Sequence, residues 1–198
     1  MKKLLSLAAV FAVALLAAAD IALPAPVKTG GMSLADALNS RHTVRRFAER
    51  ALTPQELADI LWMANGINRP DGKRTAPSAR NRQEIMIFVA LPDGAYLYDA
   101  AANTLKPVVK RDLRAAAGGF KAPCYLILVA DMEKQTSRDF AQIDVGYVSQ
   151  NIYLAVTAKG LGTCAMARIA DRDALRKELN LGQNLLLLAH PVGEPDKK

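Results

Sequence analysis

The spacing of apolar residues predicts a well-defined helix in TPQELADILWMANG, residues 53–66. Its apolar positions recur every three or four residues and so fall on one helical face. These positions are Leu57, Ile60, Leu61 and Ala64. Thr53 and Glu56 are placed to form a capping box, Pro54 suits the first helical position, and Gly66 suits the end. The segment therefore predicts an amphipathic helix with both ends defined.

A longer stretch, DFAQIDVGYVSQNIYLAVTAK at residues 139–159, predicts a second helix that ends at Gly160. Its apolar side chains are spread around much of the circumference, which is typical of a central helix buried on most sides. Shorter helices are predicted at residues 33–40 after the cap Ser33, near residues 113–117, and at residues 171–179 after the cap Asp171.

Four strands are predicted by apolar and β-branched runs that end at turn residues. They are EIMIFVA at 84–90, AYLYD at 95–99, CYLILVA at 124–130 and NLLLLAH at 184–190. The first two flank a Pro-Asp-Gly turn and predict a hairpin, whereas the uninterrupted third run is typical of a strand buried on both faces. Because helices and strands are interspersed, we expect one α+β domain with a mixed sheet.

Between the helix at 53–66 and the first strand lies GINRPDGKRTAPSARNRQ, residues 66–83. This stretch is polar and rich in Gly, Pro, Asn and Arg, so it predicts a loop. Loops of this length inside a compact domain are usually functional or disordered.

The first residues predict export. MKK is positively charged, LLSLAAVFAVALLAAA is apolar, and small residues precede Asp20, which is the pattern of a secretory signal peptide cleaved after Ala19. The apolar run is shorter than the roughly 20 residues that span a bilayer, which disfavours the alternative of an uncleaved anchor. We expect a signal peptide at 1–19, a linker at 20–32 and one domain at 33–198. The mature protein would be periplasmic or secreted, without stable membrane association.

Composition adds a mild positive charge and two cysteines. The formal net charge is +7, and it falls to +5 when Lys2 and Lys3 leave with the signal peptide. An oxidising compartment permits a disulfide between Cys124 and Cys164, while their apolar sequence surroundings are equally consistent with two buried free thiols. Two cysteines and two histidines do not supply a structural zinc site, and no metal is expected.

The segment NSRHTVRRFAER, residues 39–50, concentrates much of the positive charge. It contains Arg41, His42, Arg45, Arg46 and Arg50. Like charges repel one another unless solvent or an anion lies among them, so the segment is either a solvated basic surface or a phosphate-binding site. No aromatic residue interleaves these arginines, which disfavours a nucleic-acid platform.

Motifs of several catalytic classes are missing from the sequence. No Gly-x-Gly-x-x-Gly follows a strand, and there is neither a Walker loop nor a Gly-x-Ser-x-Gly elbow. The two histidines are not a metal-binding pair at helical spacing, and the acids are scattered singly. An enzyme with this sequence would therefore rely on a bound cofactor for its chemistry.

Three segments resemble the FMN-dependent nitroreductase family. RHTVRRF at 41–47 resembles its basic signature, APSARNRQ at 76–83 its Pro-Ser loop, and GYVSQNIYLAVTAKGLGTCAM at 146–166 its central helix and exit. The order and spacing match over residues 33–193. YLYDAAANTLKPV at 96–108 is similar to the branch that contains the SagB-type and thiazoline/oxazoline dehydrogenases. The resemblance implies an α+β, nitroreductase-like fold, a mixed β-sheet flanked by helices, in an intertwined homodimer with FMN at each interface.

The resemblance also implies which residues bind FMN. Arg41 and Arg45 would hold the phosphate and ribityl end, because guanidinium groups give two-pronged, permanently charged bonds to phosphate. His42 and Thr43 would lie near the flavin or its chain. We expect Arg46 and Arg50 on a solvated face. The resemblance would also let Lys197 or Lys198 reach the phosphate, but a frayed charged tail is the favoured interpretation.

A second set of residues would come from the other subunit and cover the flavin ring. It comprises Pro77, Ser78, Ala79 and Asn81, with Gln83 at the pyrimidine edge. The backbone of Met166 and Ala167 would pass the flavin N5 and donate an amide hydrogen bond. No catalytic side chain is expected, because the flavin carries the chemistry.

The resemblance predicts an exported FMN-dependent oxidoreductase. Hydride would pass through flavin N5 to or from a small planar substrate of nitroaromatic or quinone type. NAD(P)H is one candidate electron donor, but it is scarce outside the cytoplasm, so another donor or a dehydrogenase role stays open. Two alternatives are a non-catalytic flavin- or phosphate-ligand-binding protein of the same fold and a basic surface for anionic polymers or lipid headgroups.

Overall fold

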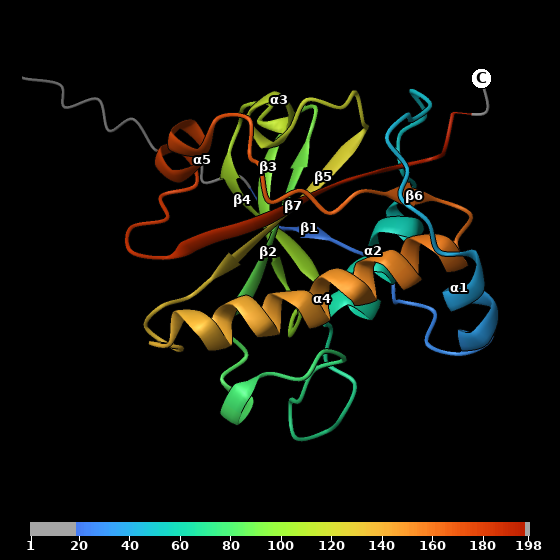
Figure 1. Cartoon of the computed structure of the whole chain (residues 1–198), viewed down its shortest axis with the longest axis horizontal. Helices are drawn as coiled ribbons and strands as arrows, with labels where there is room; N and C mark the ends of the chain where they lie inside the picture. The colour runs from blue at the N-terminus through green and yellow to red at the C-terminus, as the bar shows by residue number, and fades with distance from the viewer. Residues whose placement is uncertain (1–18, 197–198) are drawn as a thin grey trace, which may run out of the picture.

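One seven-stranded sheet runs through the computed structural model, which describes residues 19–196 (Figure 1). The strands are β1 (Ile21–Ala22), β2 (Ile85–Leu91), β3 (Gly94–Asp99), β4 (Thr104–Val109), β5 (Cys124–Ala130), β6 (Gly162–Thr163) and β7 (Leu185–Gly193). Nearly all of the expected signal peptide, and the two C-terminal lysines, lie outside the described residues.

The strand order is β1-β4-β3-β2-β5-β7-β6, and each neighbouring pair is antiparallel. The expected hairpin is present, with Phe88 opposite Leu97 and Leu91 opposite Gly94. Among the described residues, parallel pairing occurs at one isolated bridge, between Thr43 and Thr163. That bridge joins the basic segment to the sheet edge.

Helices cover both faces of the sheet, as Figure 1 shows. The helices are α1 (Leu34–Ser40), α2 (Pro54–Asn65), α3 (Arg114–Ala117), α4 (Arg138–Ala158) and α5 (Arg172–Glu178), with a 3-10 turn, η1, at Ala79–Asn81. Alternate side chains of β5 point to opposite faces. Leu126 and Leu128 pack with α2 and α4, whereas Ile127 and Val129 pack with residues of α3 and α5. The expected α+β architecture is confirmed.

The local signals in the sequence act as predicted. Thr53 accepts a hydrogen bond from the Glu56 amide, the Glu56 side chain accepts one from the Thr53 amide, and Gly66 caps the far end of α2. Ser33 and Asp171 cap α1 and α5. All seven residues of β5 are buried, as its uninterrupted apolar run predicts.

Three strands were not predicted: β1, β4 and β6. β1 and β6 have two residues each, too few to show a period. β4 contains Pro107, which cannot donate a ladder hydrogen bond, and its register with β3 shifts between Ala95 and Tyr96. β1 lies inside the expected linker 20–32, and the Val27 amide of that linker donates to Asp59 Oδ1 at 2.8 Å.

The capping box of α2 gives a direct test of the local signals. Thr53→Ala removes the side-chain acceptor for the Glu56 amide, so we expect a loss of about 1 kcal/mol in the free energy of unfolding, measured in urea. Thr136→Ala is the control, because Thr136 is exposed and no hydrogen bond is found for its hydroxyl. Equal stability of the two variants would contradict the capping role.

Candidate functional site

The basic segment is anchored to the sheet edge by backbone bonds. The Val44 amide donates to Thr163 O at 2.9 Å, and the Ala48 amide donates to Glu194 O at 2.9 Å. Val44 is buried, whereas Arg45 beside it is exposed, so the segment is fixed from within while it presents its charge outward.

Tyr153 of α4 organises the first part of this segment. The guanidinium of Arg41 lies over its ring, 5.1 Å from the centroid, and its hydroxyl is 3.3 Å from Thr43 Oγ1. The same hydroxyl accepts a hydrogen bond from the Ala165 amide at 2.9 Å. Arg41, Thr43 and the segment after β6 therefore meet at one aromatic side chain.

Below Tyr153 lies a buried chain of polar groups centred on His190, which is fully buried. His190 Nε2 is 2.9 Å from Ser149 Oγ, and Nδ1 is 3.1 Å from Thr163 Oγ1. Thr163 Oγ1 donates to Pro191 O at 2.7 Å, so it must accept from Nδ1–H, and Nε2 accepts from Ser149. Burial lowers the pKa of His190 to about 3, which keeps the ring neutral. These buried hydrogen bonds therefore hold α4, β6 and β7 together below Tyr153, and the neutral ring of His190 does not act as a proton donor to the site.

Residues 66–83 form a tied loop rather than a loose one. The Gln83 amide donates to Ser78 Oγ at 2.9 Å, and Arg74 Nε donates to Gln83 Oε1 at 3.1 Å. Gln83 Nε2 donates to Gly72 O and Asn81 Oδ1. The Gln83 side chain is thus bonded within its own loop, and its place at the pyrimidine edge of a flavin stays a prediction.

A buried acid joins this loop to α4. Asp144 Oδ2 accepts the Ala79 amide at 2.8 Å, and the Asp144 side chain is almost fully buried. Glu84, the residue that follows the loop, is fully buried as well. Burial, and next the proximity of Asp144, raise the pKa of Glu84 to about 7.

The two sets of predicted flavin contacts lie apart within one chain. Arg41 and Thr43 meet α4 at Tyr153, whereas Ala79 meets it at Asp144, nine residues away. Nine residues span about 13 Å of helix. In Figure 1 the loop lies below α4, and the basic segment passes near β6. The two sets therefore contact α4 at different points along its length.

The structure gives specific contacts for other residues singled out in the sequence. The Met166 amide donates to Ala189 O at 2.9 Å, so it cannot be the flavin N5 donor. The Ala167 amide has no acceptor among the described residues. His42 is exposed, and its Nδ1 is 2.9 Å from Ser40 O. Arg50 is exposed as expected, but it is ion-paired with Glu56 and Glu194 rather than simply solvated.

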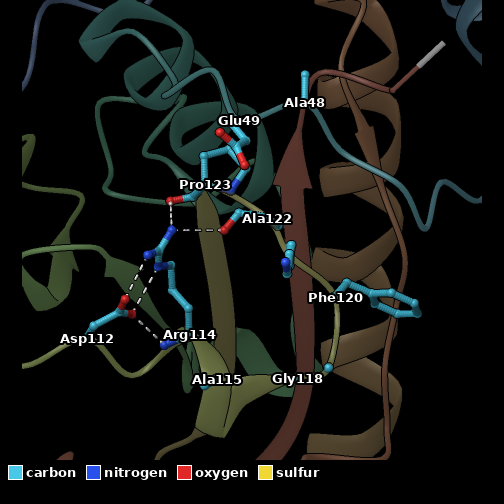
Figure 2. Close-up of a pocket in the computed structure, with 11 residues that line it drawn as sticks. Ala48, Glu49, Asp112, Arg114, Ala115, Gly118, Phe120, Ala122 and Pro123 are labelled. Atoms are coloured by element: carbon cyan, nitrogen blue, oxygen red, sulfur yellow. Dashed lines mark hydrogen bonds and ion pairs between the residues drawn. The ribbon is translucent and has the colours of Figure 1, made fainter. Parts of the chain in front are cut away.

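A cavity of about 580 Å³ lies between α3 with its flanking residues and the end of the basic segment at Ala48 and Glu49 (Figure 2). Small residues and the Phe120 ring line much of it, and Arg114 reaches across to Ala122 O at 3.1 Å. Arg114 also pairs with Asp112, so its charge is compensated. None of the predicted flavin contacts lines this cavity, and it is not the predicted site.

The remaining expectations concern thiols and metals. Cys124 and Cys164 are buried free thiols, which decides between the two alternatives. Across residues 19–196 no cluster of three potential metal ligands is found. No helix in the same part of the chain has the length and apolarity to cross a membrane.

Sequence reasoning missed Tyr153, Asp144, Glu84 and His190. Tyr153 has the helical spacing of an ordinary core residue, and a lone buried acid has no sequence pattern. The signal that was available is position in the sequence. Tyr153 lies within the central-helix motif at 146–166, Asp144 lies two residues before that motif, and Glu84 directly follows the Pro-Ser loop.

Comparison with known proteins decides the family. The profile of the nitroreductase family matches residues 38–194. The chain belongs to the nitroreductase family. A Methanocaldococcus jannaschii protein named as a nitroreductase is 31% identical over 182 residues, which cover 82% of this chain and 91% of that protein.

Solved structures agree with this nitroreductase-family fold. A crystal structure of a protein named as a nitroreductase from Ralstonia eutropha JMP134 matches with a TM-score of 0.85 and 30% identity, covering 100% of this chain and 97% of that one. A Desulfovibrio desulfuricans protein, also named as a nitroreductase and crystallised with FMN, matches with a TM-score of 0.62 and 21% identity over 82% and 86% of the two chains.

The approach of the basic segment to β6 can be tested at Gly162. A Cβ at this position would lie 2.5 Å from Val44 Cγ2 and 2.6 Å from Val44 Cβ. We expect Gly162→Ala to cost about 1–3 kcal/mol of unfolding free energy in urea. The same change should cost clearly less in a Val44→Ala background, because the collision is removed. Equal costs in both backgrounds would show that Val44 is not the obstacle.

Proposed function

We propose that this nitroreductase-family chain binds FMN and acts as an oxidoreductase on small planar substrates. The position of Arg41 and Arg45 carries the proposal. Both lie on one segment that backbone bonds anchor to the sheet edge, and neither has a carboxylate at ion-pair distance among the described residues. Two cations fixed on one anchored segment, without protein counter-charge, fit the dianionic phosphate of FMN.

The surroundings of these arginines fit the rest of such a ligand. Arg41 is held over the Tyr153 ring, and Thr43 is half-buried beside it, so both are positioned before a ligand arrives. The Ala167 amide, which has no acceptor among the described residues, could bind an acceptor atom on the flavin ring. The FMN-bound Desulfovibrio desulfuricans relative supports the choice of cofactor.

The second half of the site would come from a partner subunit. Within one chain, the loop residues Pro77, Ser78, Ala79 and Asn81 lie about 13 Å along α4 from Arg41 and Thr43. A homodimer with FMN at its interface would bring one copy's loop to the other copy's arginines.

An apolar stripe on α4 supports the homodimer. Phe140, Ile143 and Tyr147 are 41%, 53% and 45% exposed, although they are large apolar or aromatic side chains. They follow one another at helical spacing, so they share one face of α4. A contiguous exposed apolar face of this kind is typical of a protein interface. A second copy of the chain is the occupant that we propose.

When bound, FMN would supply hydride exchange at its ring. This explains why no side-chain triad is found. The protein's own residues would bind the phosphate, fix the ring orientation and, through the partner's loop, exclude water from the reacting face. We further propose an exported enzyme related to the SagB-type branch. Nitroaromatics or quinones are the proposed acceptors, and NAD(P)H is one candidate donor.

The phosphate assignment predicts a loss of FMN affinity in Arg41→Ala. Charge-assisted hydrogen bonds contribute about 1.5–3 kcal/mol, so the dissociation constant for FMN should rise about 10–100-fold. Titration of the apoprotein followed by visible absorbance measures it. The control is Lys110→Ala, which removes an exposed charge away from the site. If Arg41→Ala binds FMN as tightly as the control, Arg41 does not hold the phosphate.

The interface assignment predicts that Ile143→Asp dissociates the dimer. A charge buried in an apolar interface is costly, so sedimentation should show a monomer, and bound FMN should be lost with the partner's loop. Val108→Asp is the matched control, because Val108 is 38% exposed on β4, outside the stripe. A dimer that survives in Ile143→Asp would place the interface elsewhere.

A further inference from the structure

The loop that would cover the flavin has an unusual backbone. Arg80, Asn81 and Gln83 have φ values of 54°, 54° and 51°, in the left-handed region. Residues other than glycine adopt this region at a cost, and they keep it where the surrounding structure enforces it. The conformation of residues 78–83 therefore depends on the contacts that tie the loop down.

A hydrogen bond to Asp144 of α4 holds this loop in place. Asp144 Oδ2 accepts the Ala79 amide at 2.8 Å, one residue before the first left-handed position. The Asp144 side chain is 2% exposed, so water does not compete readily for this bond. A buried acceptor on a long helix therefore fixes the position of one amide of a strained loop.

Glu84 places a second carboxyl group against this anchor. It is 0% exposed, and neither of its carboxylate oxygens accepts a hydrogen bond from any N–H or O–H of the described residues. Its carboxyl group instead interacts with that of Asp144. A buried carboxyl group that no donor satisfies is costly to ionise, and more so near a second carboxyl group, whereas in its protonated form it can donate a hydrogen bond.

The other charged groups nearby do not remove this repulsion. Lys134 acts on Glu84 from the segment after β5, but it is exposed and already pairs with Asp131 at 3.6 Å. Arg80 and Arg82 of the loop are exposed. α2 contributes the neutral Asn65, which donates to Ile85 O. The charge interaction between Glu84 and Asp144 is therefore not offset by a buried positive group among the residues named.

We propose that Asp144 and Glu84 are positioning residues that share one proton, and that this proton keeps residues 78–83 in the conformation that covers the flavin. When the proton is lost, the two carboxylates repel each other and the Ala79 bond weakens. The loop then opens. The covering role rests on the proposed function, but the proton-dependent loop conformation does not.

The pH dependence has a definite sign. Burial and Asp144 raise the pKa of Glu84 from 4.5 to about 7. Between these values the closed loop holds a proton that an open, solvated Glu84 would release. The closed state is therefore fully favoured below pH 4.5, and it loses its advantage as the pH rises to 7.

Hydrogen exchange of the Ala79 amide tests the proposal without FMN. After correction for the intrinsic exchange rate, its protection should fall by up to tenfold per pH unit between pH 5 and 7 and then level off. The Val44 amide, bonded to Thr163 O far from the two acids, is the internal control and should show no such fall. Ala79 protection that is independent of pH over this range would overturn the proposal.

Two variants separate the shared proton from a general structural role. Glu84→Gln cannot ionise, and Asp144→Asn keeps an oxygen that can accept the Ala79 amide. In both, Ala79 protection should persist and become independent of pH. A pH dependence that persists in either folded variant would overturn the proposal. The two substitutions lie on different elements, so if one variant fails to fold, the other still tests the proposal.

FMN titration then separates this inference from the proposed function. In wild type, the dissociation constant for FMN should rise between pH 5.5 and 7.5, and in Glu84→Gln it should rise by at least threefold less. If FMN does not bind at all while Ala79 exchange behaves as expected, the proposed function fails and the proton-linked loop stands. If FMN binds and Ala79 exchange does not change with pH, the proposed function stands and the proton-linked loop fails.

Discussion

The proposed site depends on two arginines that have no carboxylate at ion-pair distance among the described residues. Arg41 and Arg45 lie on a segment that backbone bonds hold against β6 and the C-terminal residues. Arg50, which ends the same segment, instead pairs with Glu56 and Glu194. Keeping two guanidinium groups unpaired gives no stability by itself. The two positive charges instead attract an anion, and for this reason we propose a cofactor that carries a phosphate group.

α4 connects this charged edge to the rest of the proposed site. Near its end, Tyr153 holds Arg41 and Thr43, and below them His190 closes a fully bonded, neutral polar chain. Near its middle, Asp144 holds the loop that carries the second set of residues. One rigid helix thus sets the position of both sets. It also presents the apolar stripe through which a second copy would unite them.

Much of the architecture was predictable because the signals are local. The capping residues of α2 and the buried run of β5 define their elements without help from distant contacts. β4 and the two-residue strands were missed because their pairing comes from tertiary contact, and Pro107 argues against a strand. The basic segment and the Pro-Ser loop were found as motifs. Their partners Tyr153, Asp144 and Glu84 were not, because a single polar residue on a helix or beside a strand has no period.

The claim most in need of a direct test is that the unpaired arginines bind the phosphate of FMN. A crystal structure of the protein grown with saturating FMN measures this. Our account predicts the phosphate in bonding contact with the guanidinium groups of Arg41 and Arg45, at the interface of two copies. Density for FMN at another place, or Arg41 and Arg45 paired with the protein's own carboxylates while the cofactor is present, would contradict it.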